Sequence, residues 1–260
     1  MTPGEKDNDG DDEFFVGWQG RAPRKTGRAV ARVSIGATVA ALACAVVFAA
    51  LQRTYGDSKW EYGNVREFSG VLLAEPVPTL LTDAPEPASG AAVFLLVRPF
   101  KFGFDPDEAR ALNLRRVRLQ GTLLHRDGRA MIEVVPGTVA IEADAAATGR
   151  SPPAEDLGER VLVGEIVDSK CYLGAMNPGH LKTHRACAIR CISGGIPPVL
   201  LVRDEADRPV YYLLVGPDGA PVNSDVLDFV AEPVELRGRV QRLGERLVLR
   251  ADTSAIRRLP

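Results

Sequence analysis

The segment VRLQGTLLHRDGRAMIEV, residues 117–134, decides the fold. It consists of two stretches of alternating polar and apolar residues around a short glycine turn, which is the pattern of a β-hairpin. The segment VELRGRVQRLGERLVLR, residues 234–250, repeats this pattern, and each copy has a glycine inside its first strand, Gly121 and Gly238. A glycine inside a strand marks a sharp bend or a close backbone approach. The repeat therefore predicts two related β domains that end in the same bent hairpin.

The two halves of the chain remain similar upstream of these hairpins. The further matching segments are residues 69–76 with 162–170, 91–97 with 197–203, and the helical stretches 105–112 with 223–230. Each half then holds about five short strands with a helix before the final pair, which is typical of a small closed barrel of OB type. We expect a mainly β protein with short helices, in which one N-terminal transmembrane helix precedes two tandem OB-like small β-barrel domains.

The boundaries of the two barrels follow from a polar, proline-rich stretch between the halves. We expect the first barrel over residues 65–147, a linker over 148–158 and the second barrel over 159–260. Residues 168–198, which hold the clustered cysteines, lie between the first and second strand equivalents of the second half only. At that place the first half has a proline-rich segment without cysteine. The repeated scaffold does not need these cysteines, which indicates that they serve a function.

A run of 19 residues without a charged side chain, residues 33–51, lies near the N-terminus. As a helix it would span roughly 29 Å, close to the thickness of the hydrocarbon core of a bilayer. We expect a transmembrane signal-anchor over residues 29–52. Before it we expect a disordered cytoplasmic tail over residues 1–28, because its acidic start cannot bury enough apolar surface to fold. The alternative is a cleaved signal peptide, for which the small residues around Cys44 would form the cleavage site.

The charges that flank the apolar run indicate its orientation. Five basic residues lie within residues 21–32, against three within residues 52–71. The positive-inside rule then predicts a single-pass protein of the cell membrane, with its N-terminus cytoplasmic and its C-terminal domains periplasmic. A formal net charge of −2 and an aromatic content of 6% argue against nucleic acid as a partner. No nucleotide-binding loop, serine-nucleophile signature or pair of catalytic carboxylates is found, which favours a non-catalytic protein.

Three of the four cysteines and two of the three histidines lie within residues 169–191. In the spacing Cys171-x12-His184-x2-Cys187-x3-Cys191, the last three residues share one face of a helix predicted in this segment. Soft ligands on a helix face, opposite a cysteine at the end of a strand, are typical of a metal site. The sequence therefore predicts a site made by Cys171, His184, Cys187 and Cys191, with zinc or copper as the metal.

Helix geometry limits how these ligands combine. Residues i and i+7 lie about 10.5 Å apart along a straight helix, so one ion cannot gather His184, Cys187 and Cys191 together. A mononuclear site would use Cys171 with either His184 and Cys187 or Cys187 and Cys191. A broken helix and a cofactor larger than one atom are the other options. The auxiliary candidates are Asp168, which could orient a ligand histidine, Met176, whose thioether suits Cu(I), and His180.

Two alternatives use the same cysteines without a metal. A disulfide between Cys171 and Cys187 would close a loop of about 15 residues and leave one thiol over, and it would staple a structural or interaction module. A thiol–disulfide oxidoreductase would instead use Cys187 or Cys191 as the nucleophile and Cys171 as the resolving cysteine. The nearby basic residues that would lower the pKa of such a thiol are Lys170, Arg185 and Arg190.

The cysteine segment carries the motif D-x-K-C-Y … H-x-x-C-A-x-x-C-I-x-G-G-x-P, residues 168–197. Over residues 164–198 it resembles bacterial exported or membrane-anchored proteins of unassigned function. The resemblance implies a bacterial cell-envelope setting and singles out the three cysteines and His184, but it implies no reaction. Together with the anchor, it favours an extracytoplasmic accessory protein that binds a metal or redox cofactor beside a membrane redox or assembly complex.

Overall fold

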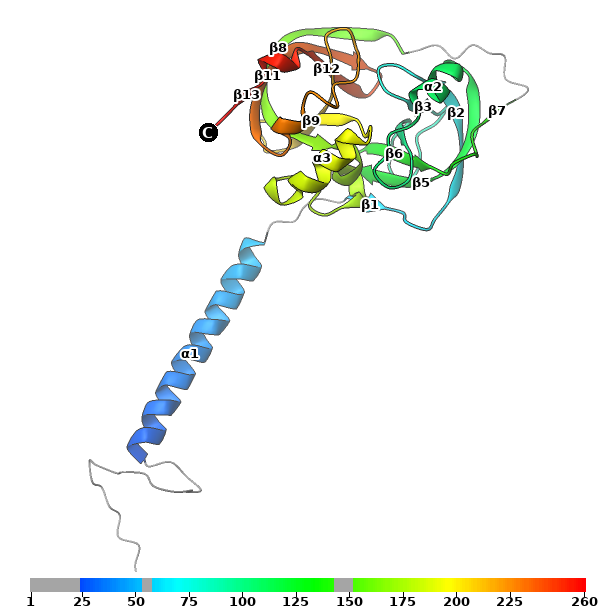
Figure 1. Ribbon diagram of the computed structural model, residues 1–260. Helices are drawn as coiled ribbons and strands as arrows, with labels where there is room; N and C mark the ends of the chain where they lie inside the picture. Colours follow the sequence, from blue (N-terminus) through cyan, green and yellow to red (C-terminus); the bar gives the residue numbers. More distant parts are fainter. Residues whose placement is uncertain (1–23, 53–57, 143–151) are drawn as a thin grey trace, which may run out of the picture. The chain divides into compact units, whose positions relative to one another are not determined.

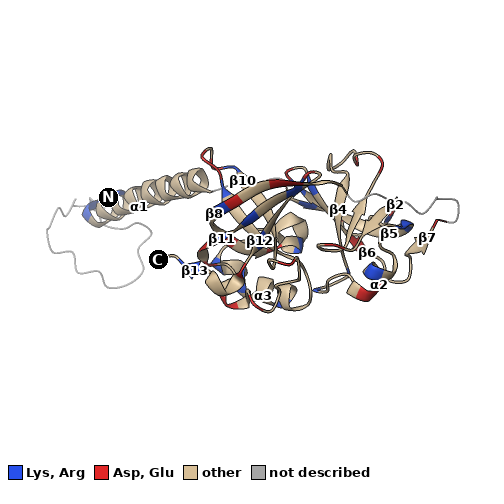
Figure 2. Cartoon of the chain, turned by 90° about the horizontal axis from the view of Figure 1, so that it is seen from above, with Lys and Arg blue, Asp and Glu red and all other residues tan. Residues whose placement is uncertain are grey.

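The computed structural model describes residues 24–52, 58–142 and 152–260 (Figure 1). Its first element is the helix α1, Arg24–Leu51, whose 28 residues make it about 42 Å long. This helix is long and apolar enough to cross a membrane. Its basic side chains lie at its N-terminal end and the remainder carries no charge (Figure 2). The helix starts before the predicted anchor, so residues 24–28 are helical, and the rest of the predicted tail lies outside the described residues.

The remainder of the chain forms one compact unit, Tyr55–Pro260, that contains two closed five-stranded barrels. The strands of the first barrel are β2 (Arg66–Leu73), β3 (Thr79–Leu81), β4 (Val93–Val97), β5 (Arg116–Arg126) and β6 (Arg129–Val134). Strand β5 pairs with both β2 and β6, which closes the barrel, and β4 and β6 run parallel. The helix α2, Pro106–Ala111, lies between β4 and β5, and the side chain of Asp105 caps its N-terminus. Two short strands, β1 (Lys59–Trp60) and β7 (Ala140–Ile141), add to β5.

The second barrel repeats this connectivity. Its strands are β8 (Ala154–Asp168), β9 (Pro198–Arg203), β10 (Pro209–Val215), β11 (Pro233–Leu243) and β12 (Arg246–Ala251). Strand β11 pairs with both β8 and β12, and β10 and β12 run parallel, as β4 and β6 do. The helix predicted over residues 223–230 is a short 3-10 turn, Leu227–Phe229. A short turn, Thr253–Ala255, and the strand β13, Arg257–Arg258, follow β12. The prediction of tandem OB-like barrels is confirmed.

Glycines shape the two closing hairpins. A side chain at Gly121 would collide with Ile132 and the backbone of Glu133, and one at Gly238 would collide with the backbone of Arg250. Both glycines are therefore needed because neighbouring strands approach them closely. The glycine that both hairpins share in the sequence is therefore needed for the close strand contacts that close each barrel.

One detail of the predicted repeat is wrong. Residues 91–97 contain β4, a third strand, whereas residues 197–203 contain β9, a second strand, so these segments are not equivalents. The true counterpart of β9 is β3, which has only three residues and leaves no clear pattern in the sequence. The connection between the first two strands is residues 74–78 in the first barrel and 169–197 in the second. The cysteine segment is therefore an insertion at that place, as predicted.

The predicted linker ends earlier than expected. Strand β8 begins at Ala154, so residues 154–158 belong to the second barrel, while residues 148–151 lie outside the described residues. This part of β8 pairs with β11 across a bulge, and acidic side chains on β8 face arginines on β11, as in the pairs Asp156–Arg239 and Glu155–Arg242. The alternation of both charge signs along these strands is visible in Figure 2. The polar composition of this segment led to the prediction of a linker, because exposed strands contain the same polar residue types as linkers do.

Three hydrophobic clusters organise the unit. One fills the first barrel and includes Leu72 and Phe94, and another fills the second barrel and includes Leu200 and Leu249. The third cluster lies between the barrels and contains buried side chains from both. These are Leu95, Val97, Leu124 and Met131 from the first barrel, and Val199, Leu213, Val215 and Val248 from the second. Cys171, Tyr172, Leu173 and Cys191 belong to this shared cluster as well. The cysteine insertion is therefore part of the contact between the two barrels.

Candidate metal centre

The insertion between β8 and β9 holds the cysteines on two short helical elements. A single π-helical turn, Cys171–Ala175, follows directly after β8, and the helix α3, Arg185–Ser193, comes after a 3-10 turn, Lys182–His184. Helix α3 ends at the Gly194-Gly195 pair. Cys187 and Cys191 are four residues apart, so they face the same side of α3 in adjacent turns. Cys171 thus meets two thiols that one helix aligns.

The three sulfur atoms converge. The Sγ atom of Cys171 lies 3.9 Å from that of Cys187 and 3.9 Å from that of Cys191, and all three lie within 4.8 Å of one another. An ion with tetrahedral metal–sulfur bonds of about 2.3 Å separates two of its ligands by about 3.8 Å. The thiols are free, and no disulfide forms among them. Of the two pairs that the sequence left open, the structure places Cys187 and Cys191 with Cys171.

His184 lies beside this group rather than inside it. Its Nε2 atom lies 3.1 Å from Oδ2 of Asp168, whose side chain is fully buried and also accepts the backbone N–H of Cys171 at 2.7 Å. Ligand atoms of Asp168, Cys171 and His184 form a second group within 4.8 Å, so the two groups share Cys171. Helix α3 begins only at Arg185, which sets His184 apart from the face that carries the cysteines. Asp168 thus contacts a histidine, but this histidine is not a member of the group of three sulfur atoms.

The remaining auxiliary candidates lie elsewhere. The side chain of Met176 is 48% exposed. The ring of His180 packs edge-on against Tyr172 at 6.2 Å, and burial lowers the pKa of this histidine to about 4. His180 belongs to neither of the two groups of ligand atoms among the described residues. The structure therefore brings together the three cysteines, with His184 and Asp168 next to Cys171.

The cation at the thiols comes from the first barrel. Lys101, in the loop between β4 and α2, places its Nζ atom 2.9 Å from Sγ of Cys187 and 3.5 Å from Sγ of Cys191. The sequence contains no local signal for this contact, because Lys101 lies far from the cysteines along the chain and in the other barrel. Only the docking of the two barrels brings them together.

Two of the three basic residues that were predicted to act on the thiols have other partners. Lys170 is buried, forms an ion pair with Glu133 and donates to the carbonyl oxygens of Arg98 and Phe100 at 3.1 and 2.6 Å. Arg185 forms an ion pair with Glu232, and Arg190 is exposed. The side chain of Lys170 contacts residues of the first barrel, whereas the thiol of its neighbour Cys171 lies beside those of α3. Proximity in sequence thus predicted the wrong lysine.

The environment shifts the pKa values of the two buried thiols, Cys171 and Cys191, in opposite directions. Hydrogen bonding from Cys171 lowers the pKa of Cys191 to about 7, and Lys101 adds to this effect, while burial and Asp168 oppose it. The hydrogen bond with Cys191, burial and Asp168 together raise the pKa of Cys171. Of these two thiols, Cys191 therefore loses its proton first, and Cys171 keeps its proton as the donor to the resulting thiolate.

This division predicts a pH dependence in the metal-free chain. Ultraviolet thiolate absorbance, measured on a Cys44→Ser background, is expected to show a transition with a midpoint near pH 7 that belongs to Cys191. The thiolate fraction rises as the pH increases through this value, which lies below the pKa of about 8.5 of an ordinary thiol. Lys101→Met should move the midpoint upward because it removes the favourable cation. A wild-type curve with no transition below about pH 8 would contradict the assignment.

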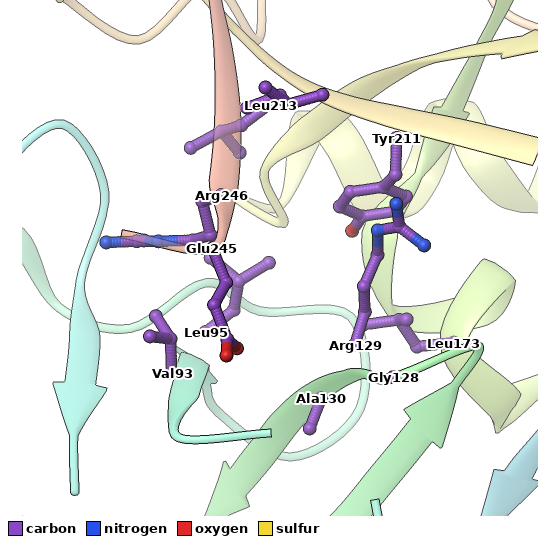
Figure 3. Close-up of a pocket in the computed structure, with 11 residues that line it drawn as sticks. Val93, Leu95, Gly128, Arg129, Ala130, Leu173, Tyr211, Leu213, Glu245 and Arg246 are labelled. Carbon is purple, nitrogen blue, oxygen red and sulfur yellow. The ribbon is translucent and has the colours of Figure 1, made fainter. Parts of the chain in front are cut away.

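Two hollows lie between the barrels, and neither is lined by the thiols. A small cavity of about 50 Å³ lies between first-barrel residues such as Leu95 and Arg129 and second-barrel residues such as Tyr211 and Arg246 (Figure 3). The guanidinium group of Arg129 lies 5.5 Å from the centre of the Tyr211 ring, while Arg246 points away from it. This volume suits a few water molecules. A groove of about 670 Å³ on another part of the surface reaches Gly103 and Gly194 beside the thiol site.

No family model, curated protein or solved structure matches this chain. The function must therefore be argued from the geometry and charge of the site.

Proposed function

We propose that this protein is a membrane-anchored extracytoplasmic accessory protein whose second barrel binds one soft metal ion through Cys171, Cys187 and Cys191. The separation of the three sulfur atoms supports this proposal most directly, because 3.9 Å is close to the ligand–ligand distance in a tetrahedral thiolate site. Thiolates favour zinc and Cu(I) over hard cations. The nearby ammonium group of Lys101 offsets part of the negative charge that three thiolates bring into a mostly buried site.

The arrangement of the anchor supports the rest of the proposal. Helix α1 is long enough to span a bilayer, and the basic residues at its N-terminal end favour a cytoplasmic N-terminus. The barrels would then lie in the periplasm of a bacterial cell, where a membrane redox or assembly complex is the partner that a fixed metal site would serve. The absence of a catalytic signature in the sequence favours an accessory role over an enzyme.

The experiment that tests this proposal measures metal and thiols together. The full-length Cys44→Ser chain would be purified in detergent without chelator or reductant, so that every remaining thiol belongs to the site. We expect one equivalent of zinc or copper per chain, with three thiols that react only after a chelator is added. A chain without metal and with a single reactive thiol would sink the proposal, since the other two cysteines would then form a disulfide.

A thiol–disulfide oxidoreductase is the second candidate. The observation in its favour is that Cys171 lies equally far from Cys187 and Cys191, so that it could resolve a mixed disulfide at either one. Of the three cysteines of the site, Cys187 is partly exposed, whereas Cys171 and Cys191 are buried. In this case Cys171→Ser would accumulate a mixed disulfide with a substrate thiol at Cys187. Under metal binding, the same variant would lose metal and trap nothing.

A further inference from the structure

We propose that the metal held by Cys171, Cys187 and Cys191 keeps one coordination position for a small soft anion from outside the chain, a thiolate or hydrosulfide, and that Lys101 holds this anion. The inference rests on the proposed metal site and names the ligand that the site would accept. It concerns a four-coordinate ion such as zinc, which binds three protein ligands and one exchangeable ligand in sites that are not purely structural.

The count of protein ligands comes first. Among the cysteine, histidine and acidic side chains of residues 24–52, 58–142 and 152–260, none joins the three sulfur atoms as a fourth member of their group. His184 approaches Cys171, but its Nε2 atom is engaged by Asp168, and it groups with Cys171 alone among the three cysteines. A tetrahedral ion on the three sulfurs therefore has one corner that no such side chain supplies.

Lys101 lies on the side of the site that reaches solvent. Cys171 and Cys191 are buried, whereas Cys187 and Lys101 are both partly exposed. A lysine ammonium group has three N–H donors and no lone pair, so as a cation it cannot itself bind the metal. Two donors of Lys101 are directed at the sulfurs of Cys187 and Cys191. The third is left to donate to a ligand at the open corner.

The loop that carries Lys101 is fixed from both sides. On one side, the buried ammonium group of Lys170 donates to the carbonyl oxygen of Phe100, one residue before Lys101. On the other, the backbone N–H of Gly103 donates to the carbonyl oxygen of Gly194 at 2.9 Å. A side chain at Gly194 would collide with the carbonyl group of Lys101. The backbone at Lys101 is therefore fixed, and the contacts with Cys187 and Cys191 place the ammonium group beside the site before any ligand arrives, which is the arrangement that binding sites require.

Charge and softness together select the ligand class. A metal that is already bound by three thiolates favours another sulfur ligand over water or a carboxylate. A charge-assisted hydrogen bond from Lys101 favours an anion over a neutral thioether. In the exchange, a metal–sulfur bond forms, the bond from the metal to a water molecule breaks, and the proton of the incoming thiol passes to the solvent. No electron is transferred.

Cobalt(II) tests the proposal because it takes the place of zinc and has visible bands that report its ligands. The full-length Cys44→Ser chain would be loaded with Co(II) and titrated with 2-mercaptoethanol or sodium hydrosulfide. We expect the visible spectrum to shift toward four sulfur ligands as the added thiolate binds. Lys101→Met should weaken this binding roughly tenfold or more, because a hydrogen bond to a charged group is lost. Lys101→Arg should keep most of it, and Lys182→Met, at an exposed lysine of the same insertion, should change nothing.

The possible results distinguish a failure of the proposed metal site from a failure of the proposed external ligand. A chain that takes up no Co(II) overturns the proposed metal site and this inference with it. A chain that binds Co(II) but whose spectrum does not respond to thiolate overturns the inference alone. The same holds if Lys101→Met binds thiolate as tightly as the parent chain.

Discussion

Replacing Cys171 by serine is expected to lower the affinity of the chain for its metal by roughly a thousandfold. Structural zinc sites bind with about 10–16 kcal/mol, so each of three thiolates accounts for about 4 kcal/mol, which corresponds to this factor. The sulfur of Cys171 lies 3.9 Å from both others, so its loss leaves only the two thiols of α3 as ligands. The measurement is a competition for zinc against a chelator of known affinity.

The matched control for this prediction is Cys44→Ser. Cys44 lies on α1, in the part of the chain separate from the barrels, so its loss should leave the affinity unchanged. Circular dichroism of each variant would confirm that the barrels still fold, because serine is small enough to replace cysteine in the shared cluster. An affinity of the Cys171→Ser variant within about threefold of the wild type would exclude this residue as a ligand.

Replacing Lys170 by methionine is expected to lower the free energy of unfolding by about 3–5 kcal/mol. The change removes one partner of a buried ion pair and leaves the carboxylate of Glu133 without its cation. The carbonyl oxygens of Arg98 and Phe100 lose a donor at the same time. Denaturant unfolding of the full-length chain in detergent measures the effect, followed by the intrinsic fluorescence of the barrels.

Two further variants make this prediction specific. Lys182→Met removes an exposed lysine whose ion pair with Glu232 spans 3.7 Å, and this should cost less than about 1 kcal/mol. The double variant Lys170→Met with Glu133→Met should recover part of the lost stability, because it leaves no unpaired buried charge. If Lys170→Met unfolds at the same denaturant concentration as the wild type, the ion pair does not hold the barrels together.

The sequence predicts the barrels well because their closing hairpins carry a constraint that is local. Gly121 and Gly238 allow neighbouring strands to approach, and the turn that follows each is read directly from its residues. Strand β3 is missed because its three residues are too few to show a period. The start of β8 is mistaken for a linker because its polar residues are paired across an exposed sheet edge rather than solvated in a loop.

The candidate site is only partly readable from the sequence. Spacing places Cys187 and Cys191 on one helix face and identifies Cys171 as their partner. The choice between the two possible pairs depends on where α3 begins, and propensity does not determine a helix start to within one residue. Neither spacing nor helix propensity could predict the contact between Lys101 and the thiols. This contact arises from the packing of two barrels, and no local pattern in the sequence encodes how they meet.

The hydrophobic cluster shared by the barrels has a consequence for the order of events in the cell. A ribosome makes the first barrel before the second, so Leu95, Val97 and Met131 are synthesised well ahead of their partners on β9 and β10. Until those strands are synthesised, the first barrel exposes a hydrophobic surface, and Lys101 lacks the thiols that it contacts in the folded protein. The first barrel therefore completes its folding only after the second barrel has been synthesised. A chain truncated after the closing hairpin of the first barrel would be prone to aggregation or degradation.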